Sequence, residues 1–440
     1  MRLIRLGWPE GPHPQPLSHA RERGDEGPVL PFPLGCRDDA SRGVGKGLGD
    51  GATPAAWERL RAVAPTESAF MTPEWLEVWW RHLGHGGGVR PLVLAVVDDR
   101  ELMALAPFCR AAIGGTGLRA LRLMGGGVSD YLDLLLTPDA ERRGSALGVL
   151  LDGLVRHGRG WDALDLHGVP AESPTVDELV AAAEARGLPC AVLPGYARPG
   201  IALDGTFETF LRSKPGKFRY NLRSRLKRLG QQGEVRFRSV TEPADVHAAL
   251  DRLVTLHAER WAGQHTATIF SSSERGRRFY ADACRAYAAR GQLDLTLLDV
   301  GDRTVAGSVS FIDRDTWYYY LPAWDPALAA YAPSSLLLAH LIESAYARGL
   351  RRFDFMLGEE PYKARWATEE RRTVNLAIGG SGARGRAAFL ALTAWQRVRD
   401  RARRSPRLQH LRRHGLGRLR AAFRAGASST DYAAASREEG

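Results

Sequence analysis

The sequence repeats one order of predicted elements twice, and this repetition restricts the fold more than any other feature does. In the first copy, residues 92–108 are typical of two strands joined by a tight acidic turn, and residues 131–136 of a third strand. In the second copy, residues 293–311 and 316–321 follow the same pattern. Because the order is the same in both, we expect the chain to contain one structural unit twice.

Each copy continues with a helix and a closing strand. Apolar residues recur at helical spacing over residues 147–155 in one copy and 337–345 in the other. Alternating residues at 161–167 and 351–357 then predict strands. The sequence therefore predicts an α/β (α+β) fold, in which each copy is a mixed, mostly antiparallel sheet flanked by helices.

Composition sets the predicted domain boundaries. Proline and glycine cluster between residues 193 and 200, which favours a join between the copies there. Residues 1–52 are rich in Gly, Pro and Arg and lack an apolar period, so we expect them to be a disordered extension. The predicted division is this extension, a first domain at 53–195, a second, catalytic domain at 196–385, and a basic amphipathic helical tail at 386–440.

The net charge of +11 is concentrated in the predicted tail. Thirteen arginines and one acid, Asp400, lie between Arg384 and Arg424, and apolar residues recur at helical spacing from Phe389 to Val398. Such a helix could lie on an anionic membrane surface or dock on the protein core. We expect no specific nucleic acid partner, because the basic residues lack interleaved aromatics.

Cysteine usage and hydropathy predict a cytoplasmic protein, and peripheral membrane contact through the tail is one of the two alternatives for that helix. Cys36, Cys109, Cys190 and Cys284 are solitary, so neither a disulfide framework nor a metal site is expected. No apolar run approaches the roughly 18 residues that a membrane span requires. The N-terminus has no apolar core of signal-peptide length.

Several strings, taken in order, resemble the bacterial GNAT-like acyltransferases of the CelD (cellulose-biosynthesis) type. These are related to the FemAB-like peptidyltransferases, which also carry two GNAT-like copies. The resemblance implies tandem GNAT-like domains and acyl transfer from a thioester such as acyl-CoA, or from aminoacyl-tRNA in the FemAB branch, onto an amine or hydroxyl. The strings are Phe70–Trp75, Ser129–Asp133, Lys214–Leu229 and Phe353–Lys363.

Many acetyltransferases hold the CoA pyrophosphate with a [Q/R]-x-x-G-x-[G/A] turn at a helix start. The corresponding residues are Glu141–Ala146, which keep one glycine, and Tyr331–Leu336, which keep none. We expect Ser334 and Ser335, with the helix amides, to contact a phosphate of acyl-CoA (acetyl-CoA) as co-substrate.

Acyl transfer requires a deprotonated acceptor, a stabilised oxyanion and a protonated leaving thiolate. Asp354 lies between aromatic residues of a predicted strand and could act as base or orient the acceptor. Glu360 is a second candidate acid, Lys363 could neutralise a phosphate, and Tyr362 could protonate the thiolate. The alternative is that these are polar residues of a solvated strand and loop.

Two further groups are candidate ligand contacts. Arg219 and Arg223 share one face of a basic helix and could grip phosphates, or could simply be solvated. Alternation puts Trp317 and Tyr319 on one side of an aromatic strand, where they could line an acyl or sugar pocket or pack in the core. In the first copy, Asp130 and Tyr131 occupy a comparable place, where a structural hydrogen bond is the alternative.

The favoured function is an acyl-CoA-dependent N- or O-acyltransferase acting on a small-molecule or saccharide acceptor in exopolysaccharide or cell-envelope biosynthesis. The transferred group would be an acyl group other than an aminoacyl group. The alternatives are a FemAB-like aminoacyl-tRNA-dependent transferase and a catalytically silent scaffold in polysaccharide assembly.

Overall fold

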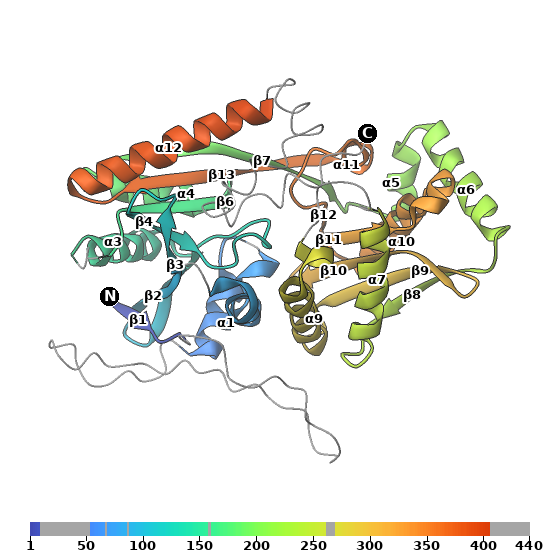
Figure 1. Ribbon diagram of the computed structural model, residues 1–440, viewed down its shortest axis with the longest axis horizontal. Coiled ribbons are helices and arrows are strands. Elements are labelled where there is room, and N and C mark those ends of the chain that lie inside the picture. Colours follow the sequence, from blue (N-terminus) through green and yellow to red (C-terminus); the bar gives the residue numbers. More distant parts are fainter. Residues whose placement is uncertain (9–52, 67, 86–87, 157–159, 261–268, 405–440) are drawn as a thin grey trace, which may run out of the picture. The chain divides into compact units, whose positions relative to one another are not determined.

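The computed structural model describes residues 1–8, 53–66, 68–85, 88–156, 160–260 and 269–404. The chain forms two compact units (Figure 1). Unit 1 comprises Met1–Gly195 and Thr373–Ser429, and unit 2 comprises Tyr196–Arg372 and Thr430–Gly440. Most of unit 2 is therefore inserted, in sequence, between two segments of unit 1.

Unit 1 is built on a sheet with the strand order β1-β2-β3-β4-β6-β13, and the short β5 pairs with β3. Every neighbouring pair is antiparallel except β4 and β6, which run parallel and are joined through helix α3. The strands are β1 (Arg2–Leu6), β2 (Arg90–Asp98), β3 (Glu101–Ile113), β4 (Leu118–Leu123), β5 (Leu135–Leu136), β6 (Ala163–Pro170) and β13 (Glu369–Gly379). The helices are α1 (Pro54–Val63), η1 (Ala69–Met71), α2 (Pro73–Trp79), η2 (Trp80–Gly84), α3 (Ala140–Arg156), α4 (Pro174–Glu184) and α12 (Gly382–Arg404).

The first residues of the chain form a strand, which corrects the prediction that all of residues 1–52 are disordered. β1 pairs antiparallel with β2, from Arg2 opposite Val97 to Leu6 opposite Val93. A Cβ at Gly153 of α3 would overlap the Leu3 side chain, so β1 also packs closely on that helix. Residues 2–6 form a strand because they can pair with the edge of β2. The average composition of residues 1–52 does not indicate this short segment. Residues 9–52 lie outside the described part of the chain.

The third strand of the first copy is β4, and the prediction of a strand at 131–136 was wrong for most of that segment. Within it, only Leu135–Leu136 pair with a neighbouring strand. Gly125 and Gly127 follow β4 with φ of 96° and 87°, a conformation that glycine adopts without strain, and they turn the chain.

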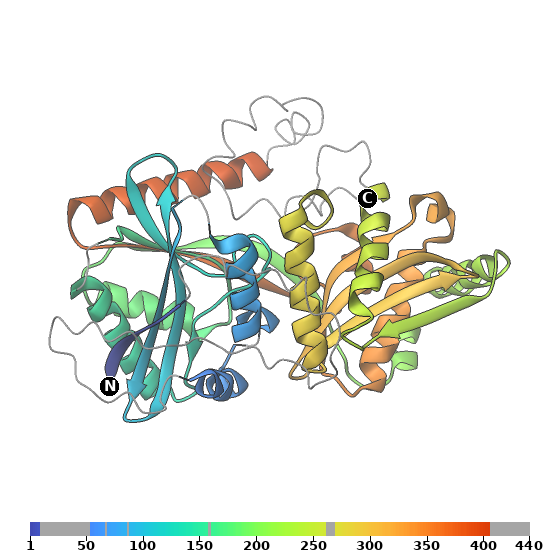
Figure 2. The same ribbon diagram turned by 60° about the horizontal axis from the view of Figure 1, so that its bottom comes forward.

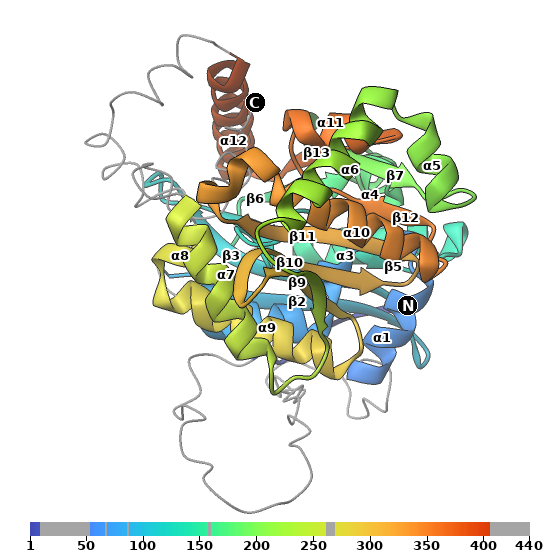
Figure 3. The same cartoon turned by 90° about the vertical axis from the view of Figure 1, so that its right-hand side faces the viewer.

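Unit 2 repeats the architecture, with the strand order β8-β9-β10-β11-β12-β7 (Figure 3). Again a single neighbouring pair, β11 and β12, is parallel, and helix α10 connects the two strands. The predicted repetition of hairpin, strand, helix and strand is therefore confirmed. The strands are β7 (Cys190–Ala202), β8 (Val235–Val240), β9 (Leu293–Val300), β10 (Arg303–Asp313), β11 (Thr316–Trp324) and β12 (Arg352–Asp354). The helices are α5 (Phe207–Ser213), α6 (Gly216–Gly230), α7 (Val246–Arg260), α8 (Ile269–Ser272), α9 (Glu274–Ala289), η3 (Pro326–Tyr331), α10 (Pro333–Ala347) and α11 (Pro361–Trp366).

The chain after Arg372 returns to unit 1, whereas the second domain was predicted to extend to residue 385. The reason is β13, which pairs with β6 from Thr373 onward. Helix α12 follows, and its Ala388 and Leu392 pack in one hydrophobic cluster with residues of β3, β4 and β6. The helical part of the predicted tail is thus packed on unit 1. Residues 405–440 lie outside the described residues.

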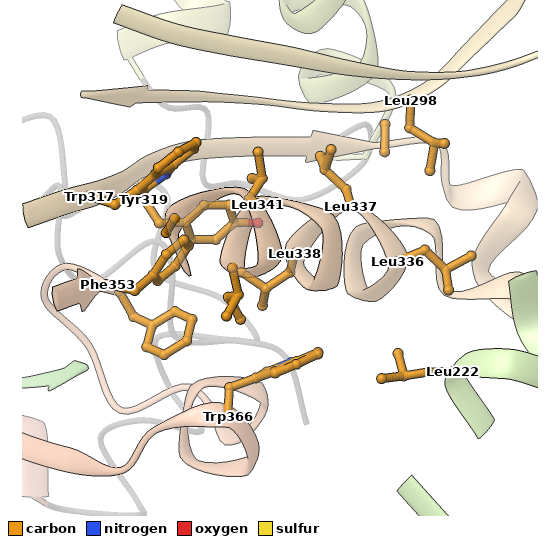
Figure 4. Close-up of a cluster of buried hydrophobic side chains, with 14 of the residues drawn as sticks. Leu222, Leu298, Trp317, Tyr319, Leu336, Leu337, Leu338, Leu341, Phe353 and Trp366 are labelled. Carbon is orange, nitrogen blue, oxygen red and sulfur yellow. The ribbon is translucent and has the colours of Figure 1, made fainter. Parts of the chain in front are cut away.

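A hydrophobic cluster of unit 2 lies between β11, β12 and α10 (Figure 4). Leu338 and Leu341 of α10 lie nearest the rings of Trp317, Tyr319 and Phe353, and Leu336 lies toward Leu222. Trp366 of α11 and Leu222 of α6 complete the cluster. This cluster therefore packs β11 and β12 against α6, α10 and α11.

Candidate active site

Strands β11 and β12 stay together over only three residue pairs. β12 runs beside Thr316–Tyr318 and ends at Asp354, while β11 continues to Trp324. At the point of departure β11 carries a bulge, because Ser310 of β10 faces Tyr319 and the next residue, Val309, faces Leu321. Bulges bend a strand and are common beside active sites. The two strands therefore diverge in the middle of β11, which is followed by η3 and then by α10.

Helix α10 begins without a side-chain cap. Its N-cap residue Ala332 has left-handed backbone angles (φ 46°, ψ 58°), and Pro333 occupies the first turn. The Ser335 amide donates to the Ala332 carbonyl at 3.0 Å. In the described part of the chain, neither the Ser334 amide nor either serine hydroxyl has a hydrogen-bond partner. The predicted phosphate contacts thus lie, half-buried, at a helix start whose dipole favours an anion.

At the corresponding helix start in unit 1, that of α3, a side chain of the protein already accepts a backbone amide. The Asp139 carboxylate accepts the Arg142 amide at 3.0 Å, so α3 has an acidic side-chain cap. Arg143 forms a two-pronged contact with Glu178, with its Nε 2.8 and 2.9 Å from the two carboxylate oxygens. An anion at α3 would therefore compete with a carboxylate already in place, and α10 has no such carboxylate cap.

Basic helix α6 packs against η3 and α10. The Arg228 guanidinium lies 5.3 Å from the centre of the Tyr331 ring, just before α10 begins. Of the two predicted phosphate contacts on α6, Arg219 donates to the carbonyls of Arg212 and Lys214 at 2.6 and 3.2 Å, and Arg223 is exposed. Arg228 is therefore the member of the basic run that the structure places beside the α10 start, and the spacing argument did not select it.

After β12 the chain makes a tight turn that the buried Asp354 carboxylate holds. One carboxylate oxygen accepts the Met356 amide at 2.7 Å, and the other lies 3.3 Å from the guanidinium of Arg198, which is equally buried. Met356 has a φ of 65°, an unfavourable angle for a residue with a side chain. Strain of this kind persists only where the surroundings impose it, and Asp354 does so here.

Glu360 and Lys363 form a second buried ion pair at the same turn. The Lys363 ammonium lies 2.8 Å from the Glu360 carboxylate and donates to the Leu357 carbonyl at 2.7 Å. The side chains are only 5% and 2% exposed. At Gly358, whose φ is 129°, a Cβ would overlap the Glu360 carboxylate. The glycine thus makes room for the ion pair.

Asp354, Glu360 and Lys363 therefore lie inside the protein, in two separate ion pairs at the turn that follows β12. Tyr362 lies half-buried against the hydrophobic core. Sequence reasoning missed Arg198, because no local pattern links it to a residue 156 positions later. The contacts give these residues positioning roles, and their predicted parts in proton transfer and phosphate binding stay predictions.

Lys214 is a further residue whose position the sequence did not indicate. Its ammonium donates to the Trp366 carbonyl at the end of α11, at 2.6 Å, and lies 4.8 Å from the centre of the Phe210 ring. Burial lowers the pKa of this lysine. Lys214 thus joins the end of α11 to the α5–α6 connection.

The four residues predicted to contact substrate lie in two different units. Trp317 and Tyr319 are 0% and 3% exposed and share the core of unit 2, so the predicted alternation is correct and core packing is their visible role. Asp130 and Tyr131 belong to unit 1. The backbone carbonyl of Tyr131 accepts a hydrogen bond from the Ser68 hydroxyl at 3.2 Å, and the predicted substrate contacts of Asp130 and Tyr131 stay predictions.

Within the described segments, no helix is long and apolar enough to cross a membrane. In the same segments, no group of three His, Cys, Asp or Glu side chains is placed to hold a metal ion.

The sequence of unit 2 matches a known family. Residues 216–364 match the family described as "Acetyltransferase (GNAT) domain". The match spans α6 to α11 and so includes the diverging strands, the start of α10 and the turn with its two ion pairs. No curated protein matches the chain.

Several solved structures are similar to this chain over about three quarters of its length. FemX is similar at a TM-score of 0.57 and 12% identity, over 74% of this chain and 96% of that chain. The C-terminal domain (DUF2156) of a putative lysylphosphatidylglycerol synthetase from Agrobacterium fabrum has a TM-score of 0.46 at 14% identity, over 78% and 95%. A tandem GNAT protein from the clavulanic acid biosynthesis pathway has 0.42 at 13%, over 76% and 98%. At such identities the likeness is one of fold, and the predicted mixed, mostly antiparallel tandem fold is confirmed.

Proposed function

We propose that unit 2 transfers an acyl group from acyl-CoA, with acetyl-CoA as the simplest donor, to an amine or hydroxyl of a small-molecule or saccharide acceptor. The setting we propose is the cytoplasmic side of exopolysaccharide or cell-envelope biosynthesis, as in the CelD-type proteins that the sequence resembles. The observation that carries the proposal is the start of α10, which has no side-chain cap and follows β11 through the short helix η3.

The donor would bind through its phosphates at this helix start. The Ser334 amide and the hydroxyls of Ser334 and Ser335 supply neutral donors, and the α10 dipole favours the negative charge. Arg228 adds a cation next to the same end of the helix. A pyrophosphate needs several donors and positive charge together, and this end of α10 offers both.

The thioester would then lie along β11 toward Asp354. A bulged strand directs backbone amides out of the ladder, where one of them can stabilise the oxyanion of a tetrahedral intermediate. In this arrangement Asp354, Glu360 and Lys363 fix the turn that borders the reacting groups. Tyr362 is the side chain in this segment that can supply a proton to the leaving thiolate.

Isothermal titration of the full chain with acetyl-CoA and CoA tests the donor site. We expect 1:1 binding in the micromolar range, and at least tenfold weaker binding when Ser334 and Ser335 are both replaced by glutamate, because two carboxylates would repel the phosphates. The matched control is Ser344→Glu, which changes the same residue type near the other end of α10. Binding that survives the double replacement would remove α10 as the phosphate site.

A second candidate is aminoacyl transfer of the FemAB type. The similarity of fold to FemX and the basic α6 favour it, because a helix with Arg223, Arg225 and Lys227 exposed or half-exposed suits a long polyanion. The same titration separates the two: no heat with any acyl-CoA, together with salt-dependent binding of aminoacyl-tRNA that Arg223→Gln weakens, would favour aminoacyl transfer over acyl-CoA chemistry.

A further inference from the structure

Helix α12 has two faces of different character. Its inner face packs on the sheet of unit 1, over which the helix lies lengthwise (Figure 2). Ala388 is 0% and Leu392 3% exposed on this side, and the buried Gln396 amide donates to Asp165 of β6 at 3.3 Å. These contacts fix the rotation of α12 about its own axis, so the direction of its other face is also fixed.

The outer face of α12 is apolar although it is exposed. Leu390 and Val398 are 63% and 65% exposed, and Trp395 at the edge of this face is 44% exposed. At 100° per residue, Leu390 and Val398 lie on one stripe with the exposed alanines 383, 387 and 394. We call this stripe the outer stripe of α12. An ordinary solvated helix would carry polar residues here.

Arg386 and Arg397 border the outer stripe on one side, and Arg401 lies within the stripe, one turn beyond Val398. All three are exposed, and none of them has an acidic partner in the part of the chain that the structure describes. Helix α12 contains seven arginines and one acid, Asp400, and the sequence that follows it continues basic. An apolar stripe bordered by cations matches the depth profile of an anionic bilayer, in which headgroup charge lies just above the acyl chains.

We propose that the outer stripe of α12 is a docking surface for an anionic lipid membrane. The helix lies in the plane of the membrane surface, with Leu390 and Val398 at the level of the acyl chains and the bordering arginines among the headgroup phosphates. Trp395 lies at the boundary between the two, where amphipathic aromatic rings are preferred. This surface belongs to unit 1, so the proposal is independent of acyl transfer by unit 2.

Sedimentation of the full chain with vesicles tests the proposal. We expect binding to phosphatidylglycerol-containing vesicles and little binding to pure phosphatidylcholine. Leu390→Ser combined with Val398→Ser should weaken binding at least tenfold, because the apolar contribution is lost. Arg397→Gln combined with Arg401→Gln should weaken it about 25-fold at low salt, about fivefold for each arginine.

Matched controls separate the surface from general effects of charge and hydropathy. Val63→Ser removes a valine of α1 that is 53% exposed, and Arg59→Gln removes an exposed arginine of the same helix. Both should leave vesicle binding within twofold of the unchanged protein. Quenching of tryptophan fluorescence by brominated lipid should fall in Trp395→Phe, although ten other tryptophans remain.

Three outcomes would overturn the proposal. The first is the absence of binding to anionic vesicles, which would leave a protein partner to explain the stripe. The second is equal binding to neutral and anionic vesicles, which contradicts the role of the arginines. The third is unchanged binding when Leu390 and Val398 are replaced, which would assign the affinity to the basic sequence after residue 404.

Discussion

Replacing Lys363 by methionine tests whether the buried pair with Glu360 is structural. The variant removes one charge and leaves the Glu360 carboxylate in a site where that side chain is 2% exposed. Breaking a buried ion pair by removing one partner costs about 3–5 kcal/mol, because the remaining charge is desolvated and unpaired. The lost hydrogen bond to the Leu357 carbonyl acts in the same direction.

Unit 2 is of a size at which 1 kcal/mol shifts the melting temperature by about 2–4 °C. We therefore expect Lys363→Met to lower Tm by about 6–20 °C in differential scanning calorimetry. Lys217→Met is the matched control, because Lys217 is an exposed residue of the same unit, and its Tm should change by no more than about 2 °C.

The double variant Glu360→Gln with Lys363→Met identifies the cause. Because it removes both charges, it should recover about 2 kcal/mol relative to the sum of the single changes. A Tm of Lys363→Met within about 2 °C of the unchanged protein would refute the structural reading. If that stable variant also lost acyl transfer, Lys363 would have the role in chemistry that its sequence context suggested.

Two further predictions concern unit 2. Burial lowers the pKa of His257 to about 4, so the unfolded chain takes up a proton below about pH 6.5 that the folded protein does not, and stability should fall as pH drops from 6.5 to 4, by about 3 kcal/mol in total. His257→Gln should remove this slope in urea unfolding at each pH, while the 68%-exposed His247 changed to Gln should retain it. Gly358→Ala should cost about 2–4 kcal/mol, because its Cβ would overlap the Glu360 carboxylate in addition to the strain of positive φ. Gly349→Ala, whose Cβ meets nothing within 4 Å, should cost only about 1 kcal/mol, and equal costs for the two would contradict the proposed crowding.

The duplicated unit was predictable from the sequence because it depends on periodicity within short segments. Alternation and helical spacing located both hairpins, both crossover helices and the strand at Asp354. The same reasoning misplaced the third strand of the first copy at Tyr131, because the glycines that turn the chain lie between that segment and β4. A local sequence pattern does not show which apolar segment pairs with a neighbouring strand and which one is buried without such pairing.

The candidate site was only partly predictable, because its geometry depends on contacts distant in sequence. The string from Phe353 to Lys363 marked the right turn, but nothing in it indicates that Asp354 faces Arg198 or that Lys363 is enclosed. Arg219 and Arg228 look equivalent in the basic run. The fold distinguishes them, since one contacts the carbonyls of its own connection and the other lies beside the start of α10.

The place of β13 in the chain has a consequence for synthesis on the ribosome. β6 pairs with β13, but about 200 residues separate the two strands in sequence, and almost all of unit 2 lies between them. At 5–20 residues per second, the ribosome needs about 10–40 s to make that interval. One edge of β6 is unpaired during this interval, and by the end of it all the residues of the unit 2 core have been made. Unit 2 can therefore finish folding before unit 1, although synthesis of unit 1 begins first. Until β13 is made, the nascent chain carries an unpaired strand edge, which is prone to pairing with other chains.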